Sequence, residues 1–425
     1  MSGVYLTMIR TKKFKTNTLS FNLLLPLKKE TAAFNAILPK ILRRGTQRHP
    51  NMELLSAVLD ELYGASATVA IRKRGEVQCV GFRGSCIENQ YTLSGESLLE
   101  TFTTLMGDLL LRPATRNGRF YEEYIDGERD NLLRQIDAIK NDKRAYAFLQ
   151  LSRNMCIDEA FGVDALGSRE VASSISGKNL FLHYNEILAT TPIEVFYCGS
   201  AKEEQVAAAV LREIQGLPRA KEQTIAETVL RREAPEDAPR TIVEEMDVSQ
   251  GRIVIGCRTG TAVWDALYPA LLLFNAALGG TVTSKLFSNV REKLSLCYEV
   301  GSMLEKQKGL LFISAGIAPK NYEAAMHEIM TQLEDARQGN FTEQELSSAR
   351  QMLVSSLLGA SDSQSRLEDF YIGQLAAGLT TGPEELAHQV AEVTNAQVKE
   401  AAGRIQVDTI YFLKGKGEGH ESQAL

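Results

Sequence analysis

The sequence has few of the residues that build metal and redox sites. Its histidines number five, no two of them four positions apart, and its six cysteines form no Cys-x-x-Cys pair. A helical zinc site of the usual kind needs two histidines on one face, and a redox site needs two close cysteines. We therefore expect no metal and no cofactor. The cysteines lie mostly in apolar segments typical of strands, which predicts buried thiols in a protein of the reducing cytoplasm.

The sequence also lacks long apolar runs and an excess of positive charge. No run is long enough to span a bilayer, and the apolar stretch 19–27 is interrupted by Ser20 and Asn22, unlike the core of a signal peptide. Lys and Arg total 47 against 53 Asp and Glu, a net charge of −6. A nucleic-acid-binding protein usually carries a basic surface. We therefore expect neither a nucleic-acid partner nor a membrane partner.

The chain contains two halves with the same pattern. Its 425 residues, 44% of them hydrophobic, are too many for one core. Strands, helices, a strand hairpin, further helices and a last strand are predicted in the same order in each half, on either side of a polar, proline-containing stretch. The prediction is an α+β protein with domains at 1–217 and 241–425, a linker at 218–240, and a mostly antiparallel sheet covered by helices in each domain.

One amphipathic segment near the N-terminus organises the first half. Thr31 is a candidate N-cap, and residues at helical spacing form an apolar stripe that should face a core. The stripe consists of Phe34, Ile37, Leu38, Ile41 and Leu42. On the opposite side Ala36, Pro39 and Lys40 share a face that we expect to be open for chemistry. Pro39 should cost about 3 kcal/mol and kink or shorten the helix.

This segment, which closes with Gly45-Thr46, resembles the first active-site helix of the M16 peptidase family, the family of insulinase and mitochondrial processing peptidase. The family pattern is His-x-x-Glu-His, four residues, then Gly-Thr; the histidines bind zinc and the glutamate is the general base. Here Ala36, Pro39 and Lys40 stand at those positions. None of them can bind zinc or take a proton from water.

A second segment matches the family's later metal-binding helix, in which Glu-Arg-Asp is followed after four residues by a glutamate ligand. Here Glu128-Arg129-Asp130 is followed by Gln135, which keeps the shape of the ligand and loses its charge. With three ligand positions and the base altered, hydrolysis by the family's mechanism is excluded. Glu128 is then expected to be an exposed charge on an amphipathic helix.

The second half keeps a motif that resembles the family's C-terminal element Ser-Arg-Leu-Phe, Arg-Glu-Lys, Leu-x-Tyr. It reads Ser284-Lys285-Leu286-Phe287, Arg291-Glu292-Lys293 and Leu296-Cys297-Tyr298. The resemblance implies that Arg291 and Tyr298 contact the backbone of a bound peptide, because a guanidinium and a phenol can hold a carbonyl oxygen. The alternative is that Arg291 pairs with a local carboxylate and Tyr298 packs half-buried in a strand.

Altered zinc positions combined with the retained Arg291 and Tyr298 predict a non-catalytic, peptide-binding subunit. The resemblance implies a fold like that of the mitochondrial processing peptidase and a heterodimer with an active M16 subunit. Two alternatives remain: a peptidase with a different metal site or base, and a homodimeric scaffold that has lost catalysis.

Overall fold

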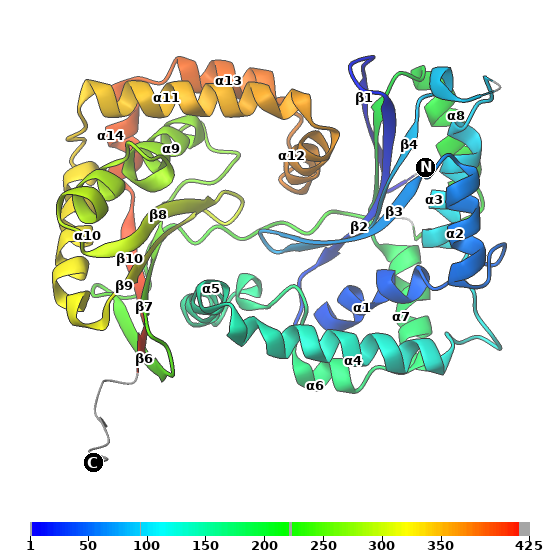
Figure 1. The fold of residues 1–425 in the computed structure, drawn as a ribbon, viewed down its shortest axis with the longest axis horizontal. Helices are drawn as coiled ribbons and strands as arrows, with labels where there is room; N and C mark the ends of the chain where they lie inside the picture. Colours follow the sequence, from blue (N-terminus) through cyan, green and yellow to red (C-terminus); the bar gives the residue numbers. More distant parts are fainter. Residues whose placement is uncertain (1, 94, 221–222, 416–425) are drawn as a thin grey trace, which may run out of the picture. The chain divides into compact units, whose positions relative to one another are not determined.

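The structure, a computed structural model, describes residues 2–93, 95–220 and 223–415. The chain forms two compact units, each around one five-stranded sheet (Figure 1). Unit 1 consists of Met1–Ala138, Val163–Glu227 and Ser363–Gly378; unit 2 consists of Ile139–Gly162, Thr228–Asp362 and Leu379–Leu425. Each unit therefore includes one segment from the other half of the sequence.

The two sheets have the same topology, as expected for duplicated halves. Their strand orders are β1-β5-β2-β4-β3 in unit 1 and β6-β10-β7-β9-β8 in unit 2. In each sheet the first pair is parallel and the other pairs are antiparallel, which confirms the predicted mostly antiparallel α+β fold. The strands of unit 1 are β1 (Val4–Arg10), β2 (Thr16–Pro26), β3 (Ser66–Arg74), β4 (Val77–Ile87) and β5 (Ile193–Gly199). Those of unit 2 are β6 (Arg240–Met246), β7 (Gly251–Arg258), β8 (Cys297–Glu305), β9 (Leu310–Ile317) and β10 (Gln406–Gly415).

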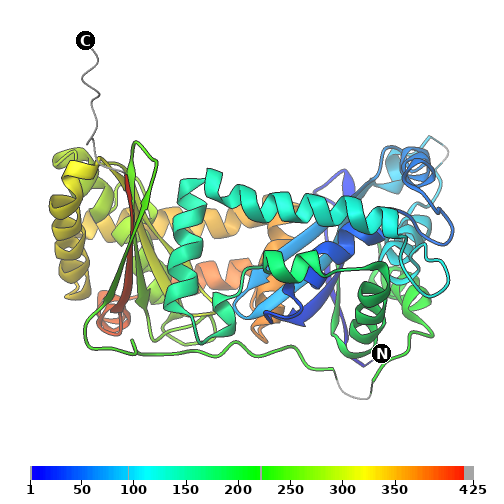
Figure 2. The same ribbon diagram turned by 90° about the horizontal axis from the view of Figure 1, so that it is seen from below.

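The helices of unit 1 cover both faces of its sheet. Alternate residues of β2 (Leu19, Phe21, Leu23) join the larger core on one face. Leu24 and the β5 residue Phe196 join smaller clusters on the other face, beneath α12 (Gln364–Ala376). The helices on the side of the larger core are α1 (Ala32–Leu42), α2 (Met52–Glu61), α3 (Leu99–Leu111), α4 (Glu122–Ala138), α6 (Arg169–Ser173), α7 (Gly177–Thr190) and α8 (Glu203–Ile214). Figure 2 shows α4 running past α1 and α6.

Unit 2 is built in the same way. Ile253 and Ile255 of β7 face its larger core, whereas Val254 faces a second cluster formed with α5 (Lys143–Met155). The sheet of each unit is thus buried on its second face by a helix from the other half of the sequence, α12 in unit 1 and α5 in unit 2. The remaining helices of unit 2 are α9 (Tyr268–Asn275), α10 (Tyr322–Arg337), α11 (Glu343–Leu358), α13 (Pro383–Ala391) and α14 (Asn395–Gly403). Two short π-helical turns, η4 (Ala276–Gly280) and η5 (Phe287–Lys293), lie between α9 and β8 in the sequence.

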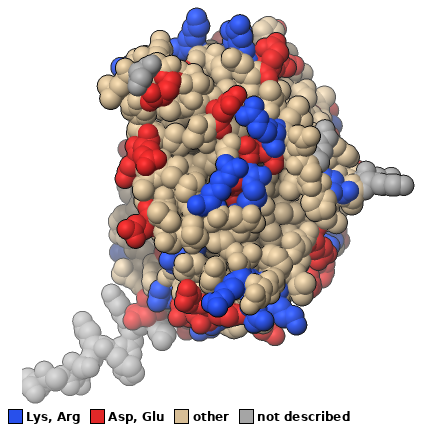
Figure 3. Space-filling model, turned by 90° about the vertical axis from the view of Figure 1, so that its right-hand side faces the viewer, with Lys and Arg blue, Asp and Glu red and all other residues tan. Residues whose placement is uncertain are grey.

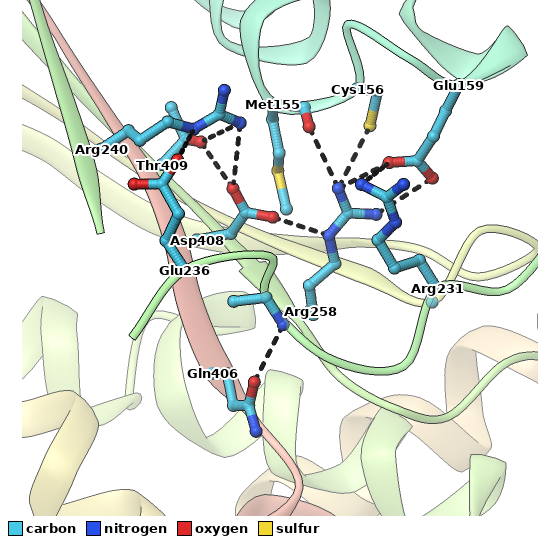
Figure 4. A network of polar contacts seen from close by, with 12 residues as sticks. Met155, Cys156, Glu159, Arg231, Glu236, Arg240, Arg258, Gln406, Asp408 and Thr409 are labelled. Atoms are coloured by element: carbon cyan, nitrogen blue, oxygen red, sulfur yellow. Dashed lines mark hydrogen bonds and ion pairs between the residues drawn. The ribbon is translucent and has the colours of Figure 1, made fainter. Parts of the chain in front are cut away.

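A buried charge network ties the segment after α5 to the sheet of unit 2 (Figure 4). The guanidinium of Arg258, which is fully buried, donates to Asp408 Oδ2 over 2.8 Å and to Glu159 Oε1 over 2.7 Å. Lys308 Nζ, also fully buried, lies 2.6 Å from Glu159 Oε2. Buried charges need such partners because an unpaired charge is costly away from water.

The thiols and the connection between the units follow from the same element order. The six cysteines are buried free thiols, as expected. Helices α4 and α5 are consecutive in the sequence but belong to different units.

On the face of unit 1 seen in Figure 3, Lys and Arg lie interspersed with Asp and Glu, and no large patch carries charge of one sign. Within residues 2–93, 95–220 and 223–415, no helix has both the length and the apolar character needed to cross a membrane.

Candidate functional site

Helix α1 carries the altered zinc positions and continues past its proline. It begins after Thr31, whose side chain forms no capping hydrogen bond, and runs to Leu42, three residues beyond Pro39. The apolar stripe faces the core as predicted. The opposite side is less open than expected, because Ala36 and Pro39 are also buried. Lys40 alone of these three residues is partly accessible.

The structure brings two of the four altered positions into direct contact. Lys40 Nζ donates a hydrogen bond to Gln135 Oε1 on α4, over 2.7 Å. Burial lowers the pKa of Lys40, while the negative charge of Glu128 acts in the opposite direction. An amine and an amide side chain thus meet where the family pattern places a histidine and a glutamate.

Glu128 is not the exposed charge that the sequence predicted. It is buried, and its carboxylate accepts two hydrogen bonds from the guanidinium of Arg44, one from Nη2 and one from Nε over 2.9 Å. Asn131 Nδ2 donates to the other oxygen over 3.2 Å. The Arg44 partner was not predicted; Arg44 lies in the turn that follows α1, two residues beyond its last residue, Leu42.

These residues do not fit a zinc ion. A zinc site needs neutral imidazoles, thiolates or carboxylates, whereas this site presents a methyl group, a proline ring, an ammonium and a neutral amide. Among the residues that the structure describes, no three His, Cys, Asp or Glu side chains gather into a possible metal site.

Arg291 and Tyr298, the two predicted peptide-binding residues, line one pocket of unit 2. The pocket has a volume of about 360 Å³ and lies between η5, the start of β8 and the loop before α10. Arg291 is on η5 and Tyr298 is the second residue of β8. The remaining lining residues are Glu292, Ser295, Leu296, Cys297, Ala318 and Asn321.

A β-bulge sets the position of Tyr298. In the β8–β9 ladder Cys297 is opposite Ile317 and Glu299 is opposite Gly316, so Tyr298 is the extra, unpaired residue. A bulge redirects the side chain that it carries. The Tyr298 side chain is 62% exposed, which contradicts the alternative of a half-buried strand residue.

Local contacts orient Arg291 without burying it. The centre of its guanidinium lies 4.6 Å from the centroid of the Phe287 ring, and Nε is 3.7 Å from a carboxylate oxygen of Glu292. Ser295, held at φ 51°, turns the chain from η5 toward β8, and its N–H donates to the carbonyl of Arg291. The alternative of a local carboxylate partner is therefore partly right. The Glu292 pair is exposed, however, and such a pair is weak.

Comparisons with known proteins match the chain to inactive homologues of a peptidase family. A family model described as the peptidase M16 inactive domain matches residues 174–353. The chain is 32% identical over 413 residues to a Bacillus subtilis (strain 168) protein described as the probable inactive metalloprotease YmfF, covering 97% of this chain and 96% of the relative.

Solved structures show the same fold along nearly the whole chain. A conserved protein from Enterococcus faecalis V583 superposes with a TM-score of 0.88 at 26% identity, covering 99% of this chain and 98% of that one. A peptidase M16 inactive domain from Pseudomonas fluorescens superposes with a TM-score of 0.76 at 16% identity, covering 98% and 97%. The chain belongs to the M16 peptidase family and is a catalytically inactive homologue of its zinc metallopeptidases.

Proposed function

We propose that this protein is a non-catalytic subunit that binds an extended peptide through Arg291 and Tyr298 and pairs with an active M16 zinc peptidase. The observation that carries the proposal is that these two side chains line one pocket, both exposed, at the start of β8. A guanidinium and a phenol O–H are both donors, so together they can hold the carbonyl oxygens or the carboxylate of a peptide.

The strand beside the pocket offers a second kind of contact. β8 is at the edge of its sheet in the described part of the chain, hydrogen-bonded to β9 on one side. An extended peptide can add to such an edge through backbone hydrogen bonds, while a nearby pocket selects its side chains or its end. The bulge at Tyr298 interrupts the ladder where the pocket begins, so a peptide along β8 would reach Arg291 at that point.

The contact between Lys40 and Gln135 supports a complex in which this chain binds the peptide and another chain cleaves it. A subunit that cannot hold zinc needs a partner to cleave what it binds, and the retained Arg291 and Tyr298 supply the binding half. The partner proposed here is an M16 subunit with an intact His-x-x-Glu-His helix.

The test is to mix the purified chain with such an active subunit and to follow cleavage of a fluorogenic peptide. Cleavage should rise on addition of the wild-type chain and should not rise with Arg291→Ala. Arg404→Ala is the matched control, because Arg404 has a similarly exposed side chain that pairs with Glu400 on α14, outside the pocket. Unchanged cleavage with the wild-type chain would contradict the proposal.

The same preparation separates the alternatives. Cleavage by this chain alone, together with bound zinc, would favour a peptidase with an altered site. A stable homodimer without affinity for peptides would favour the scaffold.

A further inference from the structure

The second face of the unit 1 sheet buries two carboxyl groups beneath α12. Glu194 on β5 and Glu368 on α12 are both fully buried. Asn22 of β2 is paired with Glu194 and with Gly81 across the sheet, so the positions beside Glu194 on β2 and β4 are an amide side chain and a glycine. A buried carboxylate is costly unless it is paired or protonated.

Glu368 is paired and Glu194 is not. Arg72 Nη2 and Arg83 Nη1 lie 2.8 Å and 3.2 Å from Glu368 Oε2. Neither oxygen of Glu194 has a hydrogen-bond partner in the described structure, and Glu368 Oε1 also has none. Three carboxyl oxygens thus lie buried beneath one helix without a bonded donor.

The arginines around this site are committed to other groups. Arg72 uses its nitrogens on Asn22, Glu368 and Asp369, and Arg74 binds Asp369. The other groups near Glu194 are the Thr7 side chain on β1 and Glu368. The polar contact with Thr7 lowers the pKa of Glu194 although its geometry does not complete a hydrogen bond, and the charge of Glu368 raises it; Cys79 on β4 is a buried neutral thiol. Burial is the largest influence and raises the pKa of Glu194 to about 8.

We propose that Glu194 retains a proton while α12 lies on the sheet, and that loss of this proton releases α12 from unit 1. Protonation removes the buried charge and the repulsion from Glu368. When α12 leaves, water reaches Glu194 and the carboxyl ionises at its ordinary pKa near 4.5. Docking of α12 thus takes up one proton between that value and about pH 8, and its equilibrium constant falls about tenfold for each pH unit in this interval.

Buried cysteines of the chain can serve as probes for the release of α12. Cys198 packs in a cluster with Leu367 of α12, and Cys79 packs in a cluster with Ile372 of the same helix. Cys86 belongs to the larger core on the opposite face of the sheet, and Cys257 belongs to unit 2. Release of α12 exposes the first two thiols, whereas unfolding of unit 1 exposes Cys86 as well.

The experiment measures the rate at which a neutral thiol reagent labels each cysteine of the full chain between pH 5.5 and 9, followed by mass spectrometry. Each rate is divided by the rate for the same cysteine in the urea-unfolded chain at that pH, which corrects for thiol ionisation. The corrected rates of Cys79 and Cys198 should rise about tenfold per pH unit up to about pH 8 and then level off. The rates of Cys86 and Cys257 should stay flat.

The variants test whether Glu194 is the group that titrates. Glu194→Gln and Glu194→Met are neutral at every pH, so the slope at Cys79 and Cys198 should vanish in whichever of them folds. Glu170→Gln, at an exposed position on α6, should keep it. A flat wild-type profile, a rise shared by Cys86, or a slope that persists without Glu194 would each overturn the proposal.

Discussion

Lys40 Nζ donates a 2.7 Å hydrogen bond to Gln135 Oε1, joining α1 to α4 at two positions where active family members bind zinc. The ammonium thus brings a positive charge to a site from which the metal ligands are gone. Arg44, in the turn that follows α1, pairs with Glu128 on α4. Both contacts join α4 to α1 or to the turn after it through hydrogen bonds, and they differ in burial.

Arg44 should matter more for stability than Lys40. Arg44→Met leaves the buried Glu128 with only Asn131 as a donor and should lower the free energy of unfolding by about 2 kcal/mol. Lys40→Met loses one hydrogen bond, but it also removes a charged ammonium that is partly desolvated in the folded state. These two effects offset each other, so this variant should change the free energy of unfolding by less than about 1 kcal/mol. Amide hydrogen exchange in α4 as a function of urea measures both. Equal losses would show that the Glu128 pair is not the stronger contact.

Restoring the family pattern should create a zinc site. The combination Ala36→His, Pro39→Glu, Lys40→His and Gln135→Glu supplies two imidazoles, a base and a carboxylate on two helices already in contact. Metal analysis after chelator-free purification should find one zinc per restored chain and none in the wild-type chain. Restoring α1 alone, without Gln135→Glu, is the control and should bind zinc more weakly. Stoichiometric zinc in the wild-type chain would mean that the metal site lies elsewhere.

The buried network of unit 2 should tolerate loss of Arg258 poorly. Arg258→Met leaves the buried Asp408 without its closest partner and leaves Glu159 with Lys308 as its remaining close partner, and it should cost about 3 to 5 kcal/mol, as is typical for a broken buried ion pair. Urea unfolding of unit 2, followed by exchange in β7, measures the loss. Arg404→Met, which removes an exposed i,i+4 pair with Glu400, should cost less than about 0.5 kcal/mol.

Glu159 should give unit 2 an acid-sensitive component of stability. Burial alone would raise the pKa of Glu159, but hydrogen bonds from Arg258 and Lys308 outweigh burial and lower it below 4.5. The folded state therefore favours the carboxylate, so this stability is present above pH 4.5 and is lost as the pH falls through the lowered pKa. Glu159→Gln should flatten the acid limb of the stability profile of unit 2. An unchanged acid limb would exclude Glu159 as its origin.

The apolar pattern predicted the larger features of the fold, and contacts between distant segments set the rest. The apolar stripe of α1 follows from local periodicity and is confirmed. The exchange of α5 and α12 between the two sequence halves was not predictable in this way, because an amphipathic helix does not specify which of two similar sheets it covers. The predicted boundaries 1–217 and 241–425 follow the sequence halves and do not include this exchange.

The sequence likewise predicted only part of the candidate site. The altered residues on α1 and Gln135 on α4 could be assigned to one site only through the family motif, because Lys40 and Gln135 are 95 positions apart in the sequence. The exposure of Tyr298 depends on a bulge in the β8–β9 ladder, which a single strand sequence does not reveal. The burial of Glu128 was missed because its partner Arg44 is 84 positions away in the sequence, in the turn that follows α1.

Direct binding of an extended, fluorescently labelled peptide to this chain alone tests the account most simply. Fluorescence polarisation should show saturable binding to the wild-type chain, about thirtyfold weaker binding to Arg291→Ala, a smaller loss for Tyr298→Phe, and wild-type binding to Arg404→Ala. The large loss corresponds to about 2 kcal/mol for a charge-assisted hydrogen bond. Absence of binding to the wild-type chain, or equal binding by Arg291→Ala, would contradict the claim that this inactive peptidase homologue holds peptides at Arg291 and Tyr298.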